Sequence, residues 1–115
     1  MAVRVEDLRD RADSGAALAQ LRRLMIAIAW FELERRRPQV CDLSTSQTAR
    51  LVRDASERAG VAVLEQLGDY HGQSRFEIWA AKFAIREMAV AARRHTNAAG
   101  RLSTKDPGPG REATR

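Results

Sequence analysis

The chain has 115 residues, which suffices for one ordinary domain with its tails but not for two sizeable cores. It has no run of about 18 apolar residues and no signal-peptide pattern at its start, so we expect a cytoplasmic protein that neither spans nor lies on a membrane. A single cysteine, Cys41, excludes an internal disulfide and a cysteine metal cluster.

The net charge of +5 arises in the C-terminal part of the chain. Residues 1–74 hold eleven arginines against eleven acidic residues, whereas residues 75–115 hold nine arginines or lysines against four acidic residues. This asymmetry favours a polyanionic partner, and nucleic acid is the first candidate. The alternative is a basic helix end and tail that serve only solubility.

Alanine, leucine, arginine and glutamate dominate the chain, and polar residues do not alternate with β-branched ones, so we predict an all-α fold. In chain order the pattern predicts a short helix and then three main helices that form a compact bundle, at residues 3–12, 16–37, 47–67 and 74–94. Ser14-Gly15 separates the first two helices, Pro38 ends the second, and the hydroxyls of residues 44–46 cap the third. Residues 1–97 are then one domain, and residues 98–115 a disordered basic tail.

Two of these helices have an apolar stripe at helical spacing. On the second helix the stripe comprises Leu18, Leu21, Met25 and Ile28, with Leu24 and Phe31 beside it. On the third it comprises Val52, Ala55, Ala59, Val63 and Leu67, whose mostly small side chains predict a close fit between helices. Both stripes are expected to face the core.

The last helix carries the segment GQSRFEIWAAKFA, residues 72–84, in a chain otherwise short of aromatic residues. At 100° per residue, four basic residues fall within roughly 40° of one another and predict an exposed basic stripe: Arg75, Lys82, Arg86 and Arg93. Phe76 and Phe83 share an adjacent stripe and are expected in the core. Trp79 lies between the two stripes, so core packing and base stacking both remain open for it.

The order of these segments resembles domain two of bacterial RNA polymerase sigma factors, in the extracytoplasmic-function group of the sigma-70 family. The likeness runs from Leu18 to Arg94, through WFELERRR, ARLVRD and LGDYHGQSRFEIWAAKFAIRE. Its most specific part is the pattern G-x-S-R-F-x-x-W-x-x-K-F-A at residues 72–84. The resemblance implies a transcription initiation factor module that binds core RNA polymerase and promoter DNA and uses neither catalysis nor a cofactor.

The resemblance also implies roles for particular residues. The loop that receives a flipped promoter base in the family corresponds to Asp69, Tyr70, His71, Gly72 and Gln73, and the face that holds the −10 single strand corresponds to Arg75, Trp79, Lys82 and Arg86, with Arg93 continuing the basic stripe. The surface for the β′ clamp helices of the polymerase corresponds to Arg50, Leu51, Arg53 and Asp54. Arg50 stands where the family carries an acid. An anti-sigma factor is a further candidate partner.

Three other readings come from different classes of protein. An enzyme or a metal site would need a convergent set of groups, but His71 and His95 are the only histidines and neither has a partner at a recognisable spacing. A membrane-surface helix is disfavoured because Glu77 and Glu87 interrupt the last helix. The closest rival is a truncated, inert or competing sigma-like fragment, since the family continues into a helix-turn-helix domain four that is not found here.

Overall fold

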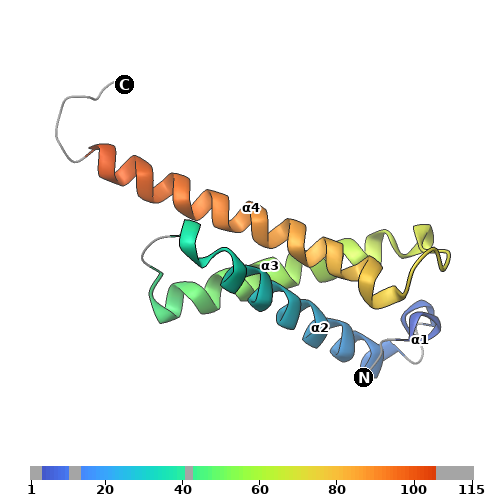
Figure 1. The fold of residues 1–115 in the computed structure, drawn as a ribbon. Coiled ribbons are helices and arrows are strands. Elements are labelled where there is room, and N and C mark those ends of the chain that lie inside the picture. The colour runs from blue at the N-terminus through green and yellow to red at the C-terminus, as the bar shows by residue number, and fades with distance from the viewer. Residues whose placement is uncertain (1–3, 11–13, 41–42, 106–115) are drawn as a thin grey trace.

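The computed structural model describes residues 4–10, 14–40 and 43–105, and these residues form helices and turns without a strand (Figure 1). The helices are α1 (Val5–Arg9), α2 (Ser14–Arg35), α3 (Thr45–Glu65) and α4 (Phe76–Lys105), and short 3₁₀ turns follow α2 at Arg37–Gln39 and α3 at Leu67–Asp69. The prediction of an all-α fold with three main helices and a short N-terminal one is therefore confirmed.

Helices α2, α3 and α4 form the bundle, and each of them packs against the other two. Figure 1 shows that α3 runs opposite to α2 and α4, and that α1 lies at the end of the bundle where α3 turns into α4. The side chain of Arg9 links α1 to that turn, because its Nη2 donates to the carbonyl of Tyr70 at 2.8 Å and to that of Leu67 at 3.3 Å. The short first helix thus braces the α3–α4 loop.

Local signals in the sequence account for the start of α3. The backbone N–H of Gln47 donates to the Ser44 hydroxyl at 3.1 Å, and the backbone N–H of Ser44 donates to the Gln47 side chain at 2.9 Å. This capping box pairs amide donors that the first turn of a helix leaves without a partner. The predicted cap is confirmed, although the helix itself begins at Thr45, two residues earlier than predicted.

Several predicted helix boundaries differ from the structure. Ser14-Gly15, predicted as a break, forms the first turn of α2, since serine is well suited to a helix start and Gly15 is exposed there. The last helix was predicted to end at Arg94, with disorder from residue 98, but α4 continues to Lys105. Asn97 and Gly100 each weaken a helix by about 1 kcal/mol or less, and Pro107 is the first residue that cannot continue one.

The first helix was predicted over residues 3–12, but α1 spans only Val5–Arg9, because Arg4 and Asp10 on either side of it are extended. Helices α2 and α3 each end two residues earlier than predicted, and α4 begins two residues later. Val3, Ala12, Cys41 and residues 106–115 of the predicted tail lie outside the described residues.

The three long helices approach one another through small side chains. The alanines at their contacts are almost completely buried, namely Ala29 on α2, Ala55 and Ala59 on α3, and Ala80 and Ala84 on α4. The predicted stripe is buried throughout, including Leu67 in the 3₁₀ turn that follows α3, so its predicted place in the core is confirmed. On α2, Leu21 and Met25 are buried and Leu18, Leu24 and Ile28 pack partly against the core.

Phe31 departs from this pattern. It was predicted beside the apolar stripe of α2, but 69% of it is exposed, because it lies about 120° around the helix from the buried Met25. The outward side of α2 therefore carries large apolar side chains.

A buried carboxylate fastens the C-terminal end of α2. The Glu32 side chain is only 3% exposed and accepts two hydrogen bonds from Arg35, at 3.1 and 2.9 Å, and one from Arg36 at 2.7 Å. Burial by itself raises the pKa of Glu32, but the hydrogen bonds and charges of Arg35 and Arg36 outweigh it, and the net pKa is lowered. The ionised form is therefore the stabilising one.

The first prediction concerns this carboxylate. Because its pKa is lower in the folded chain than in the unfolded one, its contribution to stability is present above the ordinary value of 4.5 and is lost as the pH falls through the lower folded value. Glu32→Gln should lower the free energy of unfolding at pH 7 by about 1–3 kcal/mol and remove this part of the acid sensitivity. Urea unfolding between pH 7 and pH 3 measures both effects. Glu34→Gln is the matched control, since Glu34 is exposed, its ion pair with Arg37 lies at the surface, and its loss should cost under about 1 kcal/mol. Equal losses for the two variants would contradict the account.

Candidate nucleic-acid interface

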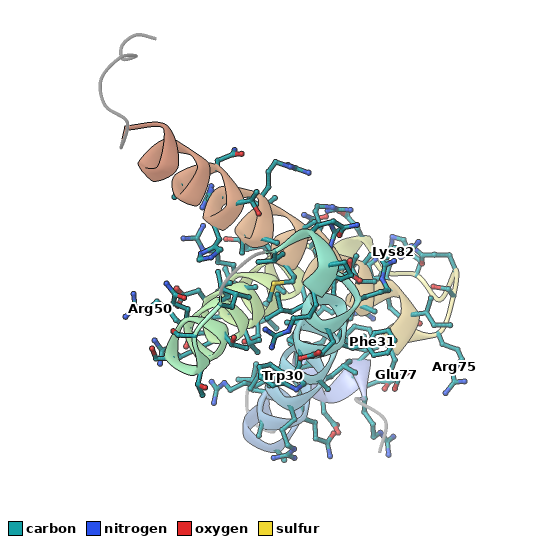
Figure 2. The ribbon with its side chains drawn as sticks, turned by 60° about the vertical axis from the view of Figure 1, so that its left-hand side comes forward. Trp30, Phe31, Arg50, Arg75, Glu77 and Lys82 are labelled. Carbon is teal, nitrogen blue, oxygen red and sulfur yellow. The ribbon has the colours of Figure 1, made fainter. Side chains whose placement is uncertain are left out.

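The predicted basic stripe exists as an exposed surface. Arg75, directly before α4, and Lys82, Arg86 and Arg93 on α4 are all exposed, while Phe76 and Phe83 between them are buried. At 1.5 Å per residue the stripe extends about 27 Å along the helix. Figure 2 shows Arg75 pointing away from the bundle at the right-hand edge, and Lys82 in the same half of the molecule. This side of α4 offers positive charge along a length that suits several consecutive phosphates.

Four of the six aromatic residues form one cluster at the start of α4. The Trp79 ring lies 5.2 Å from that of Tyr70, 5.8 Å from that of Phe76 and 5.0 Å from that of Phe83, measured between centroids. Tyr70 and Phe76 meet edge to face at 5.4 Å. Trp79 remains half-buried within this cluster. Part of the Trp79 side chain is therefore buried against the other three rings, and the rest of its surface is accessible to solvent.

A pocket of about 390 Å³ lies beside this accessible part, between the end of α3 and the basic stripe. Its lining residues are Gln66, Gln73, Ser74, Trp79, Lys82, Phe83 and Arg86. No carboxylate lines it, so its electrostatic character is positive. The Arg86 guanidinium lies 5.6 Å from the centre of the Phe83 ring, a cation–π contact that holds it at the rim. Its volume lies in the range of small-molecule sites, and its lining combines aromatic surface, amide groups and cations.

The loop between α3 and α4 is held by its own hydrogen bonds. The Tyr70 hydroxyl donates to the carbonyl of Ser74 at 2.6 Å, the backbone N–H of His71 donates to the Gln73 side chain at 2.7 Å, and the Gln73 amide donates to the carbonyl of Asp69 at 3.4 Å. Gly72 has a φ of +80°, a conformation that favours glycine. The loop is thus fixed in shape before any ligand arrives.

The five residues assigned to a base-receiving loop do not line the pocket together. Only Gln73 lines the pocket, whereas the Tyr70 ring faces the aromatic cluster and Asp69, His71 and Gly72 are exposed outside the lining. Gln66, Ser74 and Phe83 line the pocket but were not among the predicted site residues. Gln66 lies sixteen positions before Lys82, so only the folded arrangement of α3 and α4 brings them together.

The residues assigned to the polymerase lie elsewhere on the molecule. Arg50 is exposed, and Figure 2 shows it on the opposite side of the molecule from Arg75 and Lys82. Arg53 and Asp54 are exposed, and Nε of Arg53 lies 3.9 Å from Oδ1 of Asp54, which is close enough for a surface ion pair. Leu51 is half-buried against the core that contains Leu33 and Met88, and so has less surface to offer a partner.

A second pocket, of about 290 Å³, lies between α3 and α4 and mixes charges of both signs. It is lined by Leu51, Asp54, Ala55, Arg58, Glu87, Val90, Ala91, Arg94 and His95. His95 is half-buried here, whereas His71 is exposed. Across the described ranges, no three His, Cys, Asp or Glu side chains gather in a way that could hold a metal ion.

Comparisons with protein-family models, with curated proteins and with solved structures find no match for this chain. None of the helices in the described part of the chain is both long and apolar enough to cross a membrane. The candidate interface consequently rests on its own geometry: an acid-free pocket with an aromatic wall, next to a row of exposed cations.

The second prediction concerns the loop that borders this pocket. Tyr70→Phe keeps the ring in the aromatic cluster but removes the hydroxyl that donates to Ser74, so the free energy of unfolding should fall by about 0.5–1.5 kcal/mol. Amide hydrogen exchange of residues 70–75 should accelerate more than that of α2, because the lost bond is local to the loop. Unchanged stability together with unchanged exchange would show that this hydrogen bond does not hold the loop.

Proposed function

We propose that this chain is a nucleic-acid-binding transcription protein that holds single-stranded promoter DNA on α4, in the manner of sigma factor domain two, and acts in the cytoplasm. The observation that carries the proposal is the contiguity of the exposed cations Lys82 and Arg86 with a pocket whose aromatic wall is formed by Trp79 and Phe83. Cations neutralise phosphates without regard to sequence, and aromatic rings stack on bases. A single strand needs both on one surface.

The arrangement suggests how a strand would bind. Its backbone would follow the stripe from Arg75 towards Arg93, while one unstacked base enters the pocket and contacts the accessible edge of Trp79. The side-chain amides of Gln66 and Gln73 would then offer donors and acceptors to the edge of that base. Such binding is non-catalytic. It captures an open strand that would otherwise re-pair, and in this way favours the melted duplex.

Core RNA polymerase is the proposed protein partner, through the exposed side of α3 that includes Arg50, Arg53 and Asp54. Because Arg50 and the pair Arg75 and Lys82 lie on opposite sides of the molecule, polymerase and DNA would not compete for the same surface (Figure 2). We further propose that an anti-sigma factor could regulate this chain by competing with polymerase for α3 or with DNA for α4.

A second candidate function is that of an inert or competing sigma-like fragment. The observation that favours it is the exposure of Arg50, because a cation at that position would face the basic clamp surface that the resemblance implies. Such a fragment would still bind DNA through α4 but would bind the polymerase weakly. The two candidates therefore differ in polymerase affinity and agree in single-strand binding.

The third prediction tests the DNA surface. Lys82→Ala should weaken binding to single-stranded DNA to a similar degree for all sequences and reduce the slope of log K against log salt by about 0.7, the effect of one phosphate contact. Arg50→Ala also removes an exposed cation, from a surface away from α4, and should leave binding almost unchanged. Fluorescence anisotropy with a labelled oligonucleotide measures both variants. Equal losses for the two would mean that net charge, and not this surface, drives binding.

Trp79 needs a variant that keeps the fold. Trp79→Ala should weaken single-strand binding by about 1–3 kcal/mol with little change in salt slope, but it also removes a ring from the cluster and costs stability. Trp79→Phe keeps a ring among Tyr70, Phe76 and Phe83 and should give an intermediate loss. Circular dichroism controls for folding. A folded Trp79→Ala variant with undiminished binding would remove Trp79 from the interface.

The fourth prediction separates the two candidate functions. Arg50→Asp restores the acid that the resemblance expects, and should raise affinity for core RNA polymerase by a few-fold, since an exposed charge pair is worth under about 1 kcal/mol. The gain should shrink as salt increases. A pull-down titration with purified core enzyme measures it, and Arg50→Ala shows what loss of the cation alone does. No polymerase binding by either the original chain or the Asp variant would support the inert fragment.

A further inference from the structure

The outward side of α2 carries an apolar surface that no part of the described chain covers. Three large side chains on it are exposed: Ile26 by 41%, Trp30 by 45% and Phe31 by 69%. Trp30 and Phe31 are the two aromatic residues outside the α4 cluster. In Figure 2 they lie on either side of the α2 ribbon, as the 100° between successive helix residues requires. Since the inner side of α2 already contributes Leu21, Met25 and Leu33 to the core, this helix is apolar on two sides.

This outer apolar strip of α2 has opposite charges at its two ends. At 100° per residue, Ile26, Trp30, Ala27 and Phe31 lie within an arc of about 140°, and exposed Arg23 and Glu34 lie inside the same arc. Arg23 stands towards the N-terminus of the helix and Glu34 towards the C-terminus. The two residues are eleven positions apart, which is about 17 Å along the helix axis. From the N-terminal to the C-terminal end, the strip therefore consists of a cation, an apolar centre and an anion.

We propose that the strip is a self-association surface on which α2 of a second copy of this chain docks in antiparallel orientation. With the twofold axis at the level between Ile28 and Ala29, residues whose numbers sum to 57 lie at the same level along the paired helices. Arg23 then faces Glu34 of the second copy near the centre line of the strip, and Ile26 lies level with the second copy's Phe31 at the opposite margin. The small Ala27 faces the large Trp30, which lets two helices interdigitate.

The charge pattern selects this occupant and this orientation. In a twofold pair every contact occurs twice, so both ends of the strip gain an oppositely charged neighbour. A parallel pair would instead place Arg23 against Arg23 and Glu34 against Glu34, which costs affinity. Glu34 already pairs at 3.1 Å with Arg37, in the 3₁₀ turn that follows α2, and its side chain stays 51% exposed, so the second copy's Arg23 can join at the rim without burial of a charge.

The strip is short, so the expected dimer is weak. A contact of about three helical turns buries less than the roughly 800 Å² per partner of a standard stable interface. The strip contains none of the residues proposed for DNA or polymerase binding, so this inference is independent of the proposed function. In the dimer, the basic stripe of each copy would remain available, and a DNA strand could be held by two copies at once.

Sedimentation equilibrium of the full chain tests the proposal. The original protein should show a monomer–dimer equilibrium at high micromolar concentration, and Phe31→Ser should raise the dissociation constant at least tenfold. Val61→Ser is the matched control, because Val61 is 56% exposed on α3 and lies outside the strip; it should leave the equilibrium unchanged. A chain that remains monomeric at about 1 mM would overturn the proposal, and so would equal losses for the two variants.

A charge exchange tests the orientation. Arg23→Glu and Glu34→Arg should each raise the dissociation constant several-fold by placing like charges opposite each other, and the double variant R23E/E34R should restore most of the affinity. Circular dichroism at micromolar concentration checks that each variant folds, since Glu34→Arg also breaks the pair with Arg37. Failure of the double variant to recover would overturn the antiparallel register. Recovery would distinguish this dimer from association through any other surface.

Discussion

The close approach of three long helices through alanine is the constraint on which the rest of the structure depends. Ala29, Ala55, Ala59, Ala80 and Ala84 are buried where α2, α3 and α4 meet, and a larger side chain at any of these contacts would force the helices apart. The centre of the bundle therefore has little room for large residues. Leucine and methionine fill the space on either side of these contacts, and the large aromatic rings lie at one end of the bundle or outside it.

That placement explains why the candidate interface lies where α3 turns into α4. The rings of Tyr70, Phe76, Trp79 and Phe83 close this end of the core, and the Arg9 side chain ties the loop to α1. A ring that closes the end of a bundle can have one side in the core and the other at the surface. The helical period places the basic residues next to these rings. The rings that close the end of the core therefore also border the surface proposed to bind the ligand.

Local periodicity predicted the features that depend on one helix. Phe76 and Phe83 are buried and Lys82 and Arg86 exposed because a helix fixes the angles among them, whatever it packs against. The pocket could not be predicted in this way, since Gln66 reaches it from another helix and Arg9 braces the loop from 61 positions away. The predicted end of α4 was wrong because Asn97 and Gly100 weaken a helix but do not end it. The prediction for Phe31 was wrong because this residue lies beside the core-facing stripe of α2, on a face that the bundle leaves uncovered.

The most direct test of the central claim is the fluorescence of Trp79 during DNA binding. Trp30→Phe leaves Trp79 as the only tryptophan and removes the signal from the outer side of α2. When single-stranded DNA is added, the account predicts that Trp79 emission is quenched and that quenching saturates at the same DNA concentration as the anisotropy of a labelled strand, because a base stacks against the exposed edge of the ring. Saturable binding without any change in Trp79 emission would contradict the account.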